Sequence, residues 1–268
     1  MPEGAHVYPA HRNRGVGEGM GNGGGEQLRH RTTTDAWQSR GQLVVLAALP
    51  DLAGGQLILH AAGMPQSNDN QESWDERYSS QEQVWSGQPN GALVTETHGL
   101  RPGRALDVGC GEGADALWLA ECGWDVTALD VSRVALDRAA EQARRAGREV
   151  HWLHAGLVEA ALSPGSFDLV SAQYPALLRT DAHDAELALL NAVAPGGVLL
   201  VVHHPLPSDE EAEAHGFNPD DYVSPADVAA LLDDRWHIEV DETRPRHVTG
   251  GAGAAHTHDI VLRARRLT

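Results

Sequence analysis

The sequence predicts an α/β domain: a three-layer sandwich with helices on both faces of a mostly parallel, seven-stranded sheet whose last strand is antiparallel. From residue 104 onward, short apolar strands alternate with amphipathic helices, which is typical of a parallel sheet covered on both faces. A glycine-rich turn joins the first strand to the first helix. The last two strands follow each other with no helix between them, which indicates an antiparallel pair ending the sheet.

The five alternating strands are short apolar runs bounded by turn residues. They are predicted, in order, at residues 105–108, 125–130, 150–154, 167–172 and 198–203. The helices between them carry apolar residues at helical spacing and are predicted at residues 114–122, 132–146 and 181–193. The second helix has the clearest ends, because Ser132 is a typical N-cap and Gly147 a typical stop. Pro195-Gly196-Gly197 is predicted as the turn into the fifth strand.

The pattern changes after the fifth strand. Ser224 and Pro225 are typical residues of a helix start, as cap and first helical position, and this helix is predicted to end near Asp233. Two strands follow at residues 236–241 and 257–265, joined by a loop rich in Gly and His. Their direct succession predicts the antiparallel pair.

Residues 1–63 differ in composition from the rest of the chain. They hold 12 of the 29 glycines, and their charges cancel, so the net charge of −18 belongs to residues 64–268. Such a tract buries too little apolar surface to offset its ordering entropy, so we expect a disordered tail. Only Leu43–Leu49 and Leu57–Ala62 are expected to order, as a short hairpin or a docked helix. Equally, translation that starts at Met64 would make residues 1–63 a mis-assigned extension; either way, 64–268 is the predicted functional domain.

Composition excludes several classes of partner and chemistry. An acidic protein repels phosphate backbones, so we expect no nucleic-acid partner. All 20 cationic side chains are arginines, which excludes lysine Schiff-base chemistry. No stretch reaches the roughly 18 apolar residues of a membrane span, so no membrane partner is expected. Cys110 and Cys122 lie within the apolar pattern and fit packing roles in a reducing compartment, which predicts a cytoplasmic protein.

The segment Asp107–Gly113 follows a strand and opens a helix. Its glycines let the backbone turn sharply and approach a ligand, and the N–H groups at the helix start favour an anionic or electron-rich group. Asp130 ends the next strand, 21 residues after Gly109, where an acid can accept both hydroxyls of a ribose. These residues predict a pocket for an adenosine-bearing cofactor at the carboxyl ends of the strands.

Two cofactors fit this outline. Gly109, Gly111 and Ala114 satisfy the dinucleotide fingerprint. The competing pattern, acid-x-Gly-x-Gly-x-Gly, starts at Asp107 and ends at Gly113. A carboxylate at position 107 repels a pyrophosphate but suits the cationic methionine portion of S-adenosylmethionine, which favours the second cofactor. An NAD-dependent oxidoreductase and a non-catalytic adenosine-cofactor-binding module stay as alternatives.

With these motifs the sequence resembles the class I S-adenosylmethionine-dependent methyltransferases, which implies a Rossmann-like fold. The resemblance runs from Trp74 to Arg266 and includes the strand Phe167–Val170 and the turn Pro195–Gly197. Trp74–Tyr78 and Trp85–Asn90 are similar to the small-molecule enzymes of this class, including the tellurite and thiopurine types, whose N-terminal helices lie across the cofactor. The resemblance implies direct transfer of a methyl group to a small soluble acceptor, by a monomer or homodimer.

The same resemblance assigns the methionine end of the cofactor to the glycine turn. Backbone groups of Gly109, Cys110 and Gly111 are expected to contact it, with Asp107 anchoring the turn. Gln173, just past the fourth strand, is expected beside the methionine and the reacting methyl group.

At the adenosine end, Asp130 is expected to hold the ribose, Val131 to pack on the adenine and Trp85 to help cover the cofactor. One position departs from the family pattern. The family often places an Asp after the third strand to accept the adenine amino group, and this sequence has Gly156 there. Backbone groups of Ala155 and Gly156 are expected to bind the adenine instead, with weaker affinity.

His203 and His204 follow the fifth strand at its carboxyl end, where ligands bind in such sheets. A neutral histidine can act as general base for a hydroxyl, amine or thiol acceptor, so these two and Tyr174 are the candidate catalytic residues. The alternative is that they are solvated loop residues. The acceptor pocket is expected to be framed by Tyr78, Trp85, Gln173, Tyr174, His203 and His204.

Three further histidines lie near this edge if the last two strands pair. They are His247, His256 and His258, and the His-x-His spacing of the last two places both rings on one face of a strand, which is compatible with a metal. Methyl transfer needs positioning and water exclusion rather than a metal, so none is expected.

Overall fold

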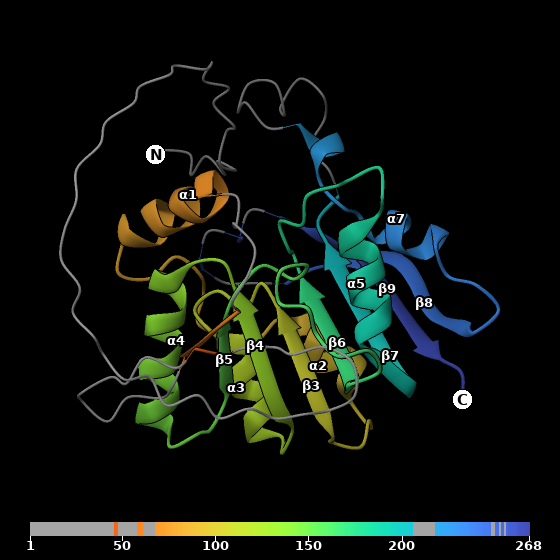
Figure 1. Cartoon of the computed structure of the whole chain (residues 1–268), viewed down its shortest axis with the longest axis horizontal. Helices are drawn as coiled ribbons and strands as arrows, with labels where there is room; N and C mark the ends of the chain where they lie inside the picture. The colour runs from red at the N-terminus through yellow and green to blue at the C-terminus, as the bar shows by residue number, and fades with distance from the viewer. Residues whose placement is uncertain are drawn as a thin grey trace, which may run out of the picture.

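The computed structural model describes residues 46–47, 58–61, 68–205, 218–247, 250–251, 253–254 and 256–268. Within them a central sheet lies between two layers of helices (Figure 1). Its strands are ordered β1-β2-β5-β4-β3-β6-β7-β9-β8. The prediction of an α/β three-layer sandwich is confirmed.

Seven strands form the predicted sheet, and their bounds follow the expected ones within a few residues, except where noted below. The parallel strands are β3 (Arg104–Val108), β4 (Asp125–Asp130), β5 (His151–His154), β6 (Phe167–Gln173) and β7 (Val193–His203). The last two are β8 (Trp236–Pro245) and β9 (His258–Arg266). Strand β9 is inserted between β7 and β8 and is antiparallel to both, which confirms the predicted antiparallel pair.

Two short strands extend the sheet beside β5. Strand β2 (Ile58–Ala61) pairs parallel to β5, and β1 (Leu46–Ala47) pairs antiparallel to β2, as a hairpin would. Met64 and most of residues 1–63 lie outside the described residues. The domain division at residue 64 and the two explanations for the segment before it therefore stay predictions.

The helices begin and end where local chemistry favours it. They are α1 (Asn68–Ser79), α2 (Gly91–Thr97), α3 (Ala114–Glu121), α4 (Arg133–Ala146), α5 (Asp184–Ala192), α7 (Pro225–Ala230) and the short 3-10 helix η1 (Pro219–Asp221). Ser132 Oγ accepts the N–H of Ala135, and Gly147 ends α4 with a φ of 63°. Ser224 forms a capping box at the start of α7.

Three boundaries were predicted wrongly. Helix α7 ends at Ala230 rather than near Asp233. Helix α5 starts at Asp184 rather than 181, because His183 before it has a left-handed backbone (φ 56°) that cannot continue a helix. Pro195-Gly196-Gly197 is not a turn that precedes the strand but lies inside β7, where the pairing with β6 changes register. Gly196, with a φ of 79°, absorbs this irregularity.

Two apolar cores fill the space between the layers. Helices α2, α3 and α4 pack on one face of the sheet, and α5 and α7 on the other. Neighbouring strand residues contribute to opposite cores, as with Ala105 and Leu106. No helix in the described part of the chain is both long and apolar enough to span a membrane.

The carboxyl ends of the parallel strands meet at one edge, and α1 lies across that edge (Figure 1). Asp75 of α1 holds it there. Its Oδ1 accepts Ser132 Oγ–H at 2.5 Å and the N–H of Val134 at 3.2 Å, at the start of α4. The fold thus produces a covered opening directly above the glycine turn.

Candidate functional site

A cavity of about 470 Å³ opens at this edge, within the size range of small-molecule sites. Its wall combines the glycine turn, the ends of β4 and β6, the segment after β5, α1 with the loop that follows it, and the β8–β9 connection. All the predicted cofactor-binding residues except Ala155 line it: Trp85, Asp107, Gly109, Cys110, Gly111, Asp130, Val131, Gly156 and Gln173. Of the predicted catalytic residues, Tyr174 and His204 line it, whereas His203 is not among the lining residues.

The glycine turn is folded tightly against β4. Gly109, Gly111 and Gly113 have φ angles of 68°, 52° and 82°, which other residues rarely adopt. The backbone N–H groups of Gly109 and Cys110 both donate to the carbonyl of Leu129, at 2.9 and 3.0 Å. These bonds fix the turn at the cavity wall before any ligand arrives.

Asp130 is held rigidly by backbone donors. Its Oδ2 accepts the N–H of Gly111 and its Oδ1 accepts the N–H of Ser132, both at 2.8 Å. Burial raises its pKa to about 6, although the two N–H groups oppose that shift. The carboxyl group is therefore oriented in advance, with unused acceptor capacity for the hydroxyls of a ribose.

Asp107 and Gln173 present buried acceptors that the described residues leave unpaired. Asp107 is 2% exposed and its Oδ2 has no hydrogen-bond partner there. Burial, followed by the nearby carboxyl groups of Asp115 and Asp130, raises its pKa well above the ordinary value. Gln173 donates from Nε2 to Ser171 Oγ at 3.0 Å, while its Oε1 has no partner. Unpaired buried acceptors at a cavity wall call for a ligand that carries donors, such as an ammonium group.

Residues 68–90, here called the cover, lie against the glycine turn. Trp85 Nε1–H donates to Tyr78 Oη at 2.9 Å, and both side chains sit against Gly111. A Cβ added at Gly111 would lie 2.7 Å from Tyr78 Oη and 3.2 Å from Trp85 Nε1. The absence of a side chain at Gly111 thus allows the aromatic residues of the cover to approach the turn.

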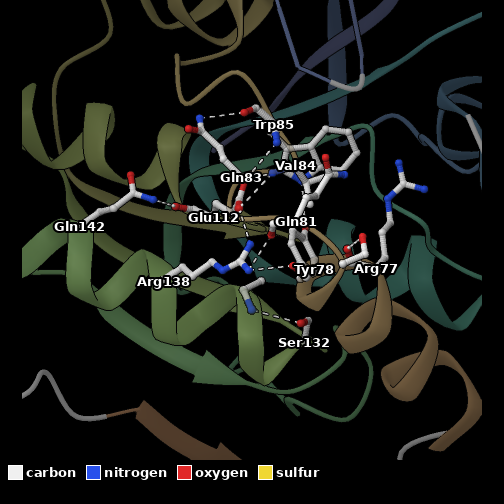
Figure 2. A network of polar contacts seen from close by, with 12 residues as sticks. Arg77, Tyr78, Gln81, Gln83, Val84, Trp85, Glu112, Ser132, Arg138 and Gln142 are labelled. Carbon is white, nitrogen blue, oxygen red and sulfur yellow. Dashed lines mark hydrogen bonds and ion pairs between the residues drawn. The ribbon is translucent and has the colours of Figure 1, made fainter. Parts of the chain in front are cut away.

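Glu112 ties the cover to the turn (Figure 2). Its carboxylate accepts the N–H groups of Val84 (3.1 Å) and Trp85 (3.0 Å), and the guanidinium of Arg138 at 2.9 Å. Arg138 also donates to the carbonyl of Tyr78 at 2.8 Å. Sequence reasoning missed Glu112 and Arg138; the one available signal was a charged residue between two motif glycines.

Three stacked rings form another part of the wall. The ring of His204 lies between those of Tyr174 (4.2 Å between centroids, 18° between planes) and His256 (3.6 Å, 8°). Tyr174 has a φ of 52°, a left-handed conformation that costs a non-glycine residue about 1–2 kcal/mol. This conformation, directly after β6, turns the chain so that the ring faces β9 rather than continuing the strand.

Arg246, directly after β8, and Asp259 of β9 support the ring stack with polar contacts. Tyr174 Oη–H donates to Asp259 Oδ1 at 2.8 Å, and Arg246 Nε–H donates to Tyr174 Oη at 3.1 Å. The Arg246 guanidinium also lies 5.0 Å from the centre of the Tyr174 ring and 3.4 Å from Asp259. Burial raises the pKa values of both Tyr174 and Asp259. Arg246 and Asp259 were not predicted, because only the register of β8 and β9 brings them to Tyr174.

The remaining predicted histidines have other surroundings. His203 is buried, with Nδ1 3.1 Å from the carbonyl oxygen of His204, and burial lowers its pKa. His247 and His258 are exposed. The described part of the chain contains no cluster of three or more His, Cys, Asp or Glu side chains suited to a metal ion. Ala155 donates its N–H to the carbonyl of Asp130 at 3.2 Å, so it joins β5 to β4.

Comparison with known proteins gives consistent matches. The methyltransferase domain family matches residues 105–197. An uncharacterized methyltransferase of Mycobacterium tuberculosis is 40% identical over 103 residues. The match covers 38% of this chain and about half (51%) of the length of that relative. A malonyl-[acyl-carrier protein] O-methyltransferase of Salmonella typhimurium is 31% identical over 199 residues, covering 65% of this chain and 76% of the relative.

Among solved structures, one comes from work on the conversion of a disulfide bond into a thioacetal group during echinomycin biosynthesis. It has a TM-score of 0.59 and 24% identity, covering 74% of this chain and 92% of the other. At this level of identity the likeness supports the fold alone.

Proposed function

Because this chain belongs to the class I S-adenosylmethionine-dependent methyltransferases, we propose that it methylates a small soluble acceptor by direct displacement. The observation that carries the proposal is a single cavity whose wall includes both the glycine turn and the ring stack of Tyr174, His204 and His256. Family membership also removes the NAD-dependent oxidoreductase from the alternatives.

The residues at one end of the cavity suit S-adenosylmethionine. In the proposal Asp107 Oδ2 and Gln173 Oε1 receive the donors of the methionine portion, and Asp130 receives the ribose hydroxyls. The bound cofactor supplies an electrophilic methyl group on a positively charged sulfur. The chain's contribution is orientation, because its acceptors are already fixed by backbone hydrogen bonds and burial.

The cover and the β8–β9 connection supply the exclusion of water that such a reaction needs. Gly251 packs directly on the cover: a Cβ added there would lie 2.5 Å from the backbone nitrogen of Ser86. Ser86, Gly250 and Gly253 all line the cavity, so these two segments close over it together.

His204 is proposed to accept the acceptor's proton, as a neutral imidazole can for a hydroxyl, amine or thiol. Tyr174 and His256 hold the plane of its ring by stacking. The raised pKa of Tyr174 keeps its hydroxyl protonated at neutral pH, which suits a positioning role rather than that of a base. His203 remains the less favoured base, because it is not among the residues that line the cavity.

The acceptor side of the cavity fits a small molecule with an apolar portion. Ala176, Leu177 and Leu178, which follow Tyr174 and Pro175 in the chain, line it. The net charge of −18 opposes a nucleic-acid acceptor. Cys110 and Cys122 are both free, in keeping with the proposed cytoplasmic location.

The test is a methyl-transfer screen of the full chain against small hydroxyl, amine, thiol and carboxyl acceptors, with labelled S-adenosylmethionine. Once an acceptor is found, His204→Asn should lower kcat by about 10²–10⁴-fold while the cofactor Kd stays unchanged. The control is His237→Asn, an exposed histidine on β8 that does not line the cavity. Methylation of protein or RNA in a parallel assay, with no transfer to any small acceptor, would refute the small-molecule acceptor. Full activity of His204→Asn would refute the role of His204 as base.

A further inference from the structure

The glycine at position 156 is not explained by its backbone. Its φ lies outside the left-handed region, so a residue with a side chain could adopt the same conformation. The position nevertheless carries no side chain, although it is the one where the resembling family often places an adenine-binding acid.

A second carboxyl group occupies the space next to Gly156. A Cβ built on Gly156 would fall on Oε2 of Glu159 and lie 3.2 Å from its Cδ. The turn that follows β5 brings the two residues together, since the N–H of Ala160 donates to the carbonyl of Gly156 at 2.9 Å. In such a helical turn, residues three apart lie on the same side. The carboxylate of Glu159 therefore occupies the space where a side chain at position 156 would begin.

The surroundings of this carboxylate are those of an adenine site. Gly156, Leu157 and Glu159 line the cavity together with Val131, whose Cγ1 lies 3.7 Å from the same Cβ position. Val131 directly follows Asp130, the carboxyl group assigned to the ribose. A base attached to a ribose at Asp130 thus has an apolar surface at Val131 and an acceptor at Glu159.

We propose that Glu159 accepts the hydrogen bond from the exocyclic amino group of the cofactor's adenine, in place of the missing acid at position 156. Gly156 is then the residue that makes room for it. The inference concerns only the cofactor and is independent of the acceptor. With Glu159 in this role, the chain should bind the adenine of the cofactor with ordinary rather than weakened affinity, and should select strongly for a 6-amino purine.

The ratio of affinities for an adenine and a hypoxanthine compound tests the role of Glu159, because general damage to the fold would weaken both and leave the ratio unchanged. The adenine amino group is a donor, whereas hypoxanthine presents a carbonyl oxygen at the same position, which a carboxylate repels. A hydrogen bond to a charged group changes affinity by about tenfold or more. The full chain should therefore bind S-adenosylhomocysteine at least about tenfold more tightly than S-inosylhomocysteine.

The experiment is calorimetric titration of the full chain and its variants with both compounds. Glu159→Ala should bring the two Kd values to within about twofold of each other, mainly by weakening the adenine compound about tenfold. Glu159→Gln keeps the size of the side chain but adds an amide donor, so it should improve binding of the hypoxanthine compound. The control Glu149→Ala, at an exposed acid that does not line the cavity, should change neither Kd.

A transfer variant tests the explanation for glycine. Gly156→Asp combined with Glu159→Ala frees the occupied space and should restore the preference for adenine. The proposal is overturned if the wild-type chain binds both compounds equally. It is also overturned if Glu159→Ala and Glu159→Gln keep the wild-type ratio of Kd values, whether or not both affinities fall.

Discussion

Asp107→Asn should change stability and cofactor affinity in different ways. The carboxyl group of Asp107 is buried, and its Oδ2 has no hydrogen-bond partner among the described residues. The carboxyl group accepts a hydrogen bond from the backbone N–H of Ala116. Burial raises its pKa, so the folded state binds its proton more tightly than the unfolded state does. Stability at this site is therefore lost as pH rises from the unfolded pKa of about 3.9 towards the folded value, and asparagine removes that loss.

The magnitudes separate the two effects. At neutral pH the cofactor-free Asp107→Asn protein should unfold at the same or a higher temperature than the wild type. Its affinity for S-adenosylmethionine should fall about 10- to 150-fold. This factor corresponds to the loss of about 1.5–3 kcal/mol, the usual contribution of a hydrogen bond to a charged group. Thermal unfolding without cofactor and calorimetric titration with it measure both quantities on the same samples.

Asp115→Asn is the matched control. Asp115 is also buried and its pKa is also raised, but both of its carboxylate oxygens accept hydrogen bonds. They accept the backbone N–H and the Nδ2–H of Asn90, each at 2.7 Å. An amide at this position leaves a buried donor unpaired and should cost about 1–3 kcal/mol of unfolding free energy. Equal destabilisation by Asp107→Asn and Asp115→Asn, or unchanged cofactor affinity in Asp107→Asn, would refute the reasoning.

Three further outcomes are expected. Gly113→Ala should lower the unfolding free energy by about 2–4 kcal/mol, because φ is 82° and the added methyl group would overlap α4 and β5; Gly91→Ala, with open space around it, should be nearly neutral in the same denaturant titration. Between pH 4 and 6 Asp130 should contribute a loss of up to about 3 kcal/mol as pH rises, since burial raises its pKa to about 6, so the fall in stability should be smaller by about that amount in cofactor-free Asp130→Asn than in the wild type; equal falls would contradict this. Glu112→Gln should cost about 1–3 kcal/mol and speed amide hydrogen exchange in the loop after α1, because Arg138 and two backbone N–H groups share its carboxylate; unchanged exchange there would argue against its anchoring role.

Features that depend on neighbouring residues in the sequence were predictable. The ends of α4 were read from Ser132 and Gly147 because capping is a local hydrogen-bonding property. The glycine turn and Asp130 were recognised because the turn and the following strand lie within about one βαβ unit, whose geometry is nearly fixed. The end of the cavity that we propose for the cofactor therefore follows largely from local sequence.

Features that depend on long-range register were not predictable. Arg246 and Asp259 reach Tyr174 only because β9 is inserted between β7 and β8, with His203 opposite Ile260. The same uncertainty affected the adjacent histidines: successive residues at a strand end point in opposite directions, so sequence alone gave no basis for preferring His204. Local backbone strain, as at Tyr174, also leaves no signal in composition.

The position of β9 also bears on the order in which the site is completed during synthesis. All five parallel strands have emerged by residue 203, so the proposed adenosine pocket can form early from contacts of modest sequence separation. The part of the cavity wall around Tyr174 forms later, because β9 is the last described strand and joins β8 to the rest of the sheet. Until β9 pairs with β7, β7 is an exposed edge strand and Tyr174 lacks its hydrogen bond to Asp259. A nascent chain should thus acquire cofactor binding before methyl transfer, and cofactor present during folding would stabilise the first half while the last strand is added.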